Sequence, residues 1–172
     1  HWFRPDGKKR AFLARMARRQ PNVFVLGPTD SVVRVFRECG FEHALTAPYP
    51  ITPSLPDGPP EDAGFKHLLF AGAARIDKGF PDVVNLVACM MERNKTLPIS
   101  IQASPDHYGR LEARVLAEID RLGRIGYSRM ALRRETLTSG EYMEQFRGAI
   151  CLQLYDPADF ADRVSGVALD AL

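Results

Sequence analysis

The sequence predicts an α/β protein built on a parallel sheet flanked by helices, and three observations support that class. Segments of strand length and of helix length alternate regularly from Phe65 onward. Each of the four apolar runs of strand length in this part of the chain is followed by an amphipathic segment. No period of about 20 to 50 residues repeats, which argues against a solenoid. The pattern therefore favours a parallel sheet with right-handed crossovers.

The composition is that of an ordinary water-soluble chain with a sizeable core. Its 172 residues are 45% hydrophobic, enough for one domain or for parts of two. No apolar run approaches the roughly 18 to 20 residues of a membrane span, and no signal-peptide core follows the first basic residues. We therefore expect a cytoplasmic protein. Cys39, Cys89 and Cys151 have no metal-ligand spacing and are expected to be reduced and buried.

The first expected helix, at about residues 7–19, is basic and amphipathic. The positive charge of this helix does not indicate that the chain binds nucleic acid, because the whole sequence carries a formal net charge of only +2. We interpret its apolar residues Phe12, Leu13 and Met16 as a stripe that packs on a sheet. Peripheral contact with the inner face of a membrane is the alternative. The basic residues of this helix are Lys8, Lys9, Arg10, Arg15, Arg18 and Arg19.

A short strand at residues 22–26, a helix capped by Thr29 or Asp30 and ending at Cys39, and a brief strand at residues 44–46 come next. The following stretch, residues 47–64, is rich in proline and is expected to be extended. These features divide the chain into three parts. We expect residues 1–50 to form a first part, 51–64 to form an interdomain linker, and 65–172 to form a Rossmann-like domain.

The second part of the chain is expected to form a Rossmann-like sheet of four strands. The expected strands are residues 68–71, 98–103, 130–132 and 150–155. The expected helices are residues 80–93, 111–122 and 140–148, the last capped by Ser139, together with one that begins near Ser165. Residues 156–162 are expected to be a loop.

A candidate phosphate site lies in residues 66–80, KHLLFAGAARIDKGF. The strand ends in Gly72, and Arg75 and Lys78 stand just before a helix that begins near Gly79. In open α/β sheets ligands bind beyond the carboxyl ends of the strands, where cations beside a helix start favour phosphate. The Walker pattern and the dinucleotide glycine fingerprint are both absent, so any phosphate contact rests on side-chain charge. The alternative is that both cations are solvated loop charges.

A second candidate stretch, residues 155–172, repeats the order of strand end, loop and helix start. Ser165 suits a helix cap, and Gly166 lets a phosphate approach the backbone N–H groups. Asp170 lies about one turn further along, where a carboxylate can accept hydrogen bonds from ribose hydroxyls. Its alternative interpretation is a solvated charge on a helix.

Three segments, FAGAARIDKGF, EYMEQFRGAICLQLYDP and DRVSGVALDAL, occur in this order and spacing. Together they resemble the C-terminal domain of GT-B glycosyltransferases, in particular the retaining, glycogen-synthase-like and mannosyltransferase-like group (family 4-like, group 1). The resemblance covers roughly Phe65 to the end. It implies metal-independent transfer of a hexosyl group from a nucleoside diphosphate sugar to a hydroxyl of a glycan or lipid-linked acceptor, with no cofactor. It also implies that the chain is part of a longer enzyme, in which residues 1–50 end the first, acceptor-side Rossmann-like domain and 65–172 belong to the second, donor-binding one.

The resemblance also assigns roles to residues. The family's basic pair, which grips the donor diphosphate, falls on Arg75 and Lys78. Its acidic pair falls on Asp162, toward the sugar, and Asp170, toward the ribose, both Asp here where the family has Glu. Arg75, Lys78 and Asp162 are the expected catalytic residues. The expected donor-binding residues are Gly72, Arg75, Lys78, Arg163, Ser165, Gly166, Val167 and Asp170.

Two other classes of protein remain open at this point. A non-catalytic Rossmann-like module that recognises a nucleotide or a phosphosugar would need the same two cations but neither acidic partner. An interaction domain with no ligand would need none of them. No D-x-D motif flanked by apolar residues appears, so a bound metal ion is not expected.

Overall fold

The computed structural model describes residues 5–47, 64–105, 109–160 and 165–171. The chain divides into two compact units, one formed by residues 1–51 with 158–165 and the other by residues 52–157 with 166–172. The expected proline-rich linker lies almost wholly outside the described residues. Its extended conformation and the expected domain boundaries therefore stay predictions.

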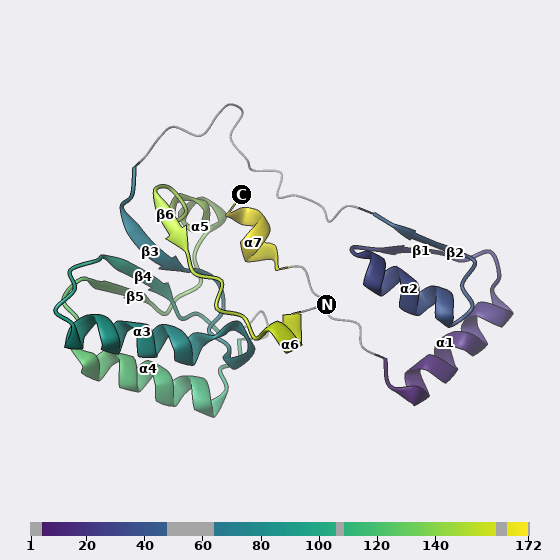
Figure 1. The fold of residues 1–172 in the computed structure, drawn as a ribbon, viewed down its shortest axis with the longest axis horizontal. Helices are drawn as coiled ribbons and strands as arrows, with labels where there is room; N and C mark the ends of the chain where they lie inside the picture. Colours follow the sequence, from purple (N-terminus) through teal and green to yellow (C-terminus); the bar gives the residue numbers. More distant parts are fainter. Residues whose placement is uncertain (1–4, 48–63, 106–108, 161–164, 172) are drawn as a thin grey trace. The chain divides into compact units, whose positions relative to one another are not determined.

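The first unit contains a parallel β-α-β arrangement preceded by a helix (Figure 1). Helix α1 spans Gly7–Arg19 and is followed by strand β1 at Phe24–Gly27, helix α2 at Asp30–Glu38 and strand β2 at His43–Thr46. The two strands pair in parallel, with Phe24 opposite His43. Thr29, one of the two cap residues that the sequence predicts, caps α2, because its hydroxyl accepts a hydrogen bond from the N–H of Val32.

Helix α1 packs through its apolar side, which confirms the first interpretation of this segment. Ala17 is buried in a cluster with Val33 and Ala44, and Leu13 and Met16 pack against the same cluster. The predicted stripe differs in one member, because Phe12 is 51% exposed and lies beneath the guanidinium of Arg15 at 5.6 Å from its ring centre.

The outer side of the β1–β2 pair is apolar and uncovered among the described residues. Phe24 and Leu26 are each 67% exposed and Leu45 is 49% exposed, while the Phe24 ring stacks on His43 with centres 4.7 Å apart. Because side chains alternate along a strand, Val25 and Ala44 face the other way, into the core.

The second unit is built on a four-stranded sheet in the order β5-β4-β3-β6, with all neighbours parallel. The strands are β3 at His67–Phe70, β4 at Ile99–Gln102, β5 at Met130–Arg133 and β6 at Ala149–Cys151. Both sheets are parallel and are flanked by helices. The Rossmann-like α/β class predicted from the sequence is therefore confirmed.

Each face of this sheet carries different helices (Figure 1). Helices α3 at Phe80–Glu92 and α4 at Ala113–Ile125 pack together over one face, where Phe70 and Ile101 join their core. On the other face, Val167 of helix α7 (Gly166–Asp170) packs on Leu69 of β3 and on Ala71, which follows that strand. Helix α5, Ser139–Glu144, leads into the same apolar cluster through Tyr142 and Phe146.

Three expectations about element boundaries are wrong. Helix α5 is capped by Thr138 instead of Ser139, because Thr138 and Glu141 form a reciprocal capping box. Strand β6 ends at Cys151 instead of Tyr155, because its only partner among the described strands, β3, has its last pair at Leu69–Cys151. Part of the expected loop 156–162 is a short helix, α6, at Pro157–Phe160, which a first-turn proline favours.

Two further observations concern expectations about composition. The three cysteines are free, with Cys39 buried and Cys89 and Cys151 half-buried. Among the described residues, no helix combines the length and the apolar character that crossing a membrane requires.

Gly79 is the residue on which the turn between β3 and α3 depends. It has a φ of 76°, a left-handed conformation that favours glycine. A β-carbon at this position would lie 1.9 Å from the carbonyl oxygen of Leu154, in the segment that follows β6. The turn and that segment therefore touch backbone to backbone.

We predict that Gly79→Ala destabilises the protein by about 2 to 4 kcal/mol, because it adds a steric clash to a left-handed strain. The matched control is Gly123→Ala, since Gly123 lies inside α4 with open space around it. That substitution should stabilise the helix by about 0.5 to 1 kcal/mol. Denaturant unfolding followed by circular dichroism measures both. Equal effects of the two substitutions would contradict the assigned role of Gly79.

Candidate functional site

The loop after β3 is held in place by the end of β4. Gly72 has a φ of 89°, and its N–H donates a hydrogen bond of 2.9 Å to the side-chain oxygen of Gln102. Ala74 donates its N–H to the carbonyl of Ser104 at 3.1 Å, beside a parallel bridge between Ala73 and Ser104. Because its N–H already donates to Gln102, Gly72 does not offer that N–H to a ligand. What it contributes to a site is the space left by its missing side chain.

The structure brings Lys78, Gly72 and Val167 together. Lys78 ends the short 3₁₀ turn Ile76–Lys78, which precedes α3. A β-carbon on Gly72 would lie 3.5 Å from the Lys78 ammonium nitrogen and 3.2 Å from a methyl group of Val167. Three of the predicted donor-binding residues thus meet, although they come from two segments about 90 residues apart.

These two segments flank the point where the strand order of the sheet changes direction. The chain runs from β3 outward through β4 to β5, and then returns to place β6 on the opposite side of β3. In open α/β sheets the crevice at such a switch point, outside the carboxyl ends of the strands, is where ligands bind. Gly72 and Lys78 follow β3, while Val167 and Asp170 follow β6.

Lys78 carries a charge in a poorly solvated place. Burial lowers the pKa of its ammonium group, the positive charge of Arg75 lowers it further, and Asp77 partly opposes both. No salt bridge joins Lys78 to a carboxylate within the described part of the chain. An anion bound beside Gly72 would compensate this charge.

Arg75 is paired with Asp77 of its own turn. Its Nε donates to Oδ1 of Asp77 at 2.9 Å, and its terminal nitrogen donates to Oδ2 at 2.5 Å. This fork of two charge-assisted bonds fixes the guanidinium and neutralises much of its charge. Sequence reasoning missed Asp77, although a carboxylate two residues away in the same turn is a local signal that predicts such a pair. Arg75 therefore reaches a ligand anion only by sharing or leaving Asp77.

Asp170 is held by a residue that sequence reasoning missed. The hydroxyl of Tyr142, on α5, donates to Oδ2 of Asp170 at 2.9 Å. Burial raises the pKa of Tyr142, and the Asp170 carboxylate raises it further, so this hydroxyl stays a donor at neutral pH. Tyr142 also packs edge-on against Phe146, with ring centres 5.2 Å apart. A carboxylate accepts at about four lone-pair sites, so this bond is compatible with a further donor.

The remaining predicted residues are only partly covered by the structure. Helix α7 begins at Gly166, immediately after Ser165 in the sequence, which agrees with the expected helix start. Asp162 and Arg163 lie outside the described residues, so their expected roles toward the sugar and the phosphate stay predictions. Within the described part of the chain, no group of three or more His, Cys, Asp or Glu side chains is arranged to hold a metal ion.

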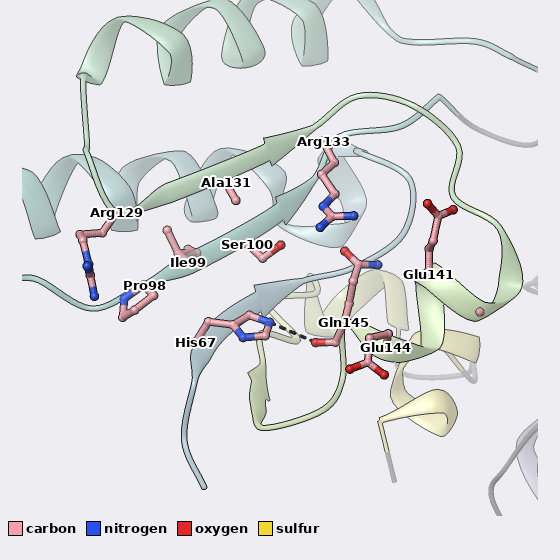
Figure 2. Close-up of a pocket in the computed structure, with 11 residues that line it drawn as sticks. His67, Pro98, Ile99, Ser100, Arg129, Ala131, Arg133, Glu141, Glu144 and Gln145 are labelled. Atoms are coloured by element: carbon pink, nitrogen blue, oxygen red, sulfur yellow. Dashed lines mark hydrogen bonds between the residues drawn. The ribbon is translucent and has the colours of Figure 1, made fainter. Parts of the chain in front are cut away.

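A separate cavity of about 660 Å³ lies over β4 and β5 (Figure 2). Its lining includes His67, Ser100, Arg129, Arg133 and Gln145, and it contains none of the predicted donor-site residues. The predicted site is therefore a cluster at the carboxyl ends of β3 and β6, away from this cavity.

Comparison of the chain with protein-family models, with curated proteins and with solved structures found no match. Any assignment of function to this chain rests on the sequence pattern and on the geometry described above.

The lowered pKa of Lys78 predicts how stability depends on pH. A cation whose pKa is lower in the folded than in the unfolded protein destabilises the fold while it is protonated, and this penalty is lost as the pH rises toward the ordinary value of 10.5. Lys78→Met removes the charge, so it should stabilise the ligand-free protein at neutral pH. Its advantage over the wild type should shrink as the pH rises through the folded pKa toward 10.5.

Denaturant unfolding at a series of pH values measures this difference. The control is Lys95→Met, because Lys95 is exposed beyond the far end of α3 and makes the same change of charge. The control should show no comparable convergence. A difference between Lys78→Met and wild type that stays constant with pH would show that the ammonium of Lys78 is well solvated.

Proposed function

We propose that this chain binds the diphosphate of a nucleoside diphosphate sugar between Lys78 and the segment after β6, and that it serves a hexosyltransferase. The observation that carries the proposal is the half-buried ammonium of Lys78, which has no salt bridge among the described residues and lies beside Gly72 at the switch point of the sheet. A lysine of this kind recognises phosphate as a compact point charge. The resemblance of the ordered motifs between Gly72 and Asp170 to GT-B glycosyltransferases indicates a nucleoside diphosphate sugar as the donor.

The arrangement provides each part that the donor requires. Lys78 contacts the diphosphate, and Arg75 joins it when the anion competes with Asp77 for the guanidinium. The small side of Gly72 leaves room for the phosphate oxygens to approach. Asp170, oriented by Tyr142, accepts hydrogen bonds from the ribose hydroxyls. In this proposal, the carboxylate of Asp162 contacts the sugar of the donor.

The chemistry follows from charge development during the transfer. When the hexosyl–oxygen bond breaks, the sugar becomes oxocarbenium-like and the leaving diphosphate gains negative charge. A fixed cation beside that diphosphate stabilises the transition state more than the ground state. Lys78 supplies this charge, so the step needs no metal ion at the diphosphate. The oxygen of a hydroxyl on a glycan or lipid-linked acceptor then bonds to the sugar carbon, and its proton passes to the leaving diphosphate.

The proposal is tested by assaying the full-length protein with UDP-, GDP- and ADP-sugars and following hexosyl transfer or slow donor hydrolysis. We expect the protein to accept one of these nucleotide sugars as its donor substrate. With that donor, Lys78→Met should lower kcat/KM by about 10- to 100-fold, which corresponds to the roughly 1.5 to 3 kcal/mol of a hydrogen bond to a charged group. Lys95→Met serves again as the control with unchanged kinetics.

Two outcomes would count against this function. If the protein binds a nucleotide sugar tightly but neither transfers nor hydrolyses it, the chain is the non-catalytic binding module. If Lys78→Met and Lys95→Met lower kcat/KM equally, the diphosphate does not lie at Lys78.

A further inference from the structure

Helix α1 has two different sides, and only one of them is covered by the first unit. Ala17 is buried, and Leu13 and Met16 pack into the same apolar cluster. The opposite side carries four exposed residues, Lys8, Phe12, Arg15 and Arg19. Because they follow one another at intervals of four, three and four residues, their side chains form one line along the helix. We call these four residues the cationic stripe.

The cations of α1 have few carboxylates near them. The helix contains six basic residues and no acidic one. Arg10, which lies on the side of the helix nearer the core, pairs with Glu38 at 2.9 Å. The carboxylate of Asp6, just before the helix, accepts a hydrogen bond from the backbone N–H of Lys9. Within the described part of the chain no salt bridge reaches the cations of the stripe, so the stripe is complementary to an anionic surface.

An apolar ring lies in the middle of the cationic stripe. Phe12 is 51% exposed, and the guanidinium of Arg15 covers it only from one side, at 5.6 Å from the ring centre. The phosphates along a nucleic-acid duplex would leave such a ring in water, whereas the boundary between lipid headgroups and acyl chains accepts it. The stripe is also straight and about 16 Å long at the usual helical rise, so all of it can touch a flat surface.

We propose that α1 docks the protein on an anionic lipid bilayer, with the helix axis in the plane of the headgroups. The cations of the stripe lie among the anionic headgroups, and Phe12 enters the boundary with the acyl chains. Packing on the sheet and membrane contact, which the sequence offers as alternatives, use opposite sides of the same helix, so docking requires no unfolding of α1. The stripe shares no residue with the cluster at Gly72 and Lys78, and the proposal is therefore independent of the transferase function.

Sedimentation of the full-length protein with lipid vesicles measures docking. One set of vesicles is phosphatidylcholine alone, and the other is an equimolar mixture of phosphatidylcholine and phosphatidylserine, which is anionic. We expect binding to the mixed vesicles to be tighter by about 10-fold or more at low salt. This preference should fall steeply between about 0.05 and 0.5 M salt, because exposed charges are screened over a shorter distance as salt rises.

Two double variants with the same loss of charge separate the stripe from net charge. Arg15→Gln with Arg19→Gln should weaken binding to the mixed vesicles about 25-fold, since each cation near an anionic surface contributes about 5-fold. The matched control is Arg114→Gln with Arg124→Gln, which removes two exposed cations from α4 in the second unit and should weaken binding by less than about 3-fold. All four positions are exposed, so thermal unfolding should be unchanged in both variants.

A third variant distinguishes a lipid surface from other polyanions. Phe12→Gln keeps a residue that favours a helix, and it should weaken binding to the mixed vesicles by about 5-fold because the ring no longer leaves water. Binding of the wild type and of this variant to a DNA duplex should be equal and weaker than binding of the wild type to the mixed vesicles.

Several results would overturn the proposal. Binding to neither kind of vesicle would exclude membrane docking. Equal binding to both kinds would indicate an apolar contact, such as one made by the exposed Phe24 and Leu26 of β1. Equal weakening by the two double variants would indicate attraction by net charge alone. Tighter binding to DNA than to the mixed vesicles would identify the stripe as a nucleic-acid surface, and no effect of Phe12→Gln would contradict entry of α1 into the lipid boundary.

Discussion

The backbone contact between Gly79 and Leu154 is the constraint on which the candidate donor site depends. It joins the turn that ends β3 to the segment that leaves β6, at a separation where no side chain fits. The same turn ends in Lys78 and starts α3, whose apolar side forms much of the core. Any residue larger than glycine would separate the turn from the segment. The position of Lys78 is thus set by packing that involves both sides of the switch point.

This arrangement holds Lys78 where its charge is poorly solvated and is only partly offset by the charges of its neighbours. Asp77 is committed to Arg75 by two hydrogen bonds and only partly offsets the charge of Lys78. A bound diphosphate would supply the missing negative charge. Binding sites commonly contain groups whose pKa is perturbed by burial, because such groups interact strongly with a ligand of opposite charge.

The fold was largely predictable because its signals are local. The alternation of short apolar runs with amphipathic segments predicted the parallel sheet of the second unit, and cap residues such as Thr29 predicted where a helix begins. Errors occurred where tertiary pairing decides the outcome. Strand β6 looks long in the sequence because its apolar run continues to Leu154, but β3 offers it only a short edge.

The candidate site was predictable in its anchors and not in its partners. Gly72, Lys78 and Val167 were expected to share a site, and the structure places the Lys78 ammonium and a methyl group of Val167 beside Gly72. The bond from Tyr142 to Asp170 was not expected, because the two residues lie on separate helices and nothing in the spacing pairs them. The cavity at Gln145 was missed for the same reason. A buried glutamine with an unpaired oxygen is recognised only once its neighbours are known.

The most direct test of the donor site is to map the residues that a nucleoside diphosphate contacts. Titrating the isotope-labelled full-length protein with UDP, GDP and ADP and following backbone amide shifts locates the ligand without requiring turnover. We expect the largest shifts at residues 72–79 and 166–170, with the cavity beside Gln145 unaffected. Shifts confined to other parts of the chain, or none with any of the three at millimolar concentration, would contradict a diphosphate site at Lys78.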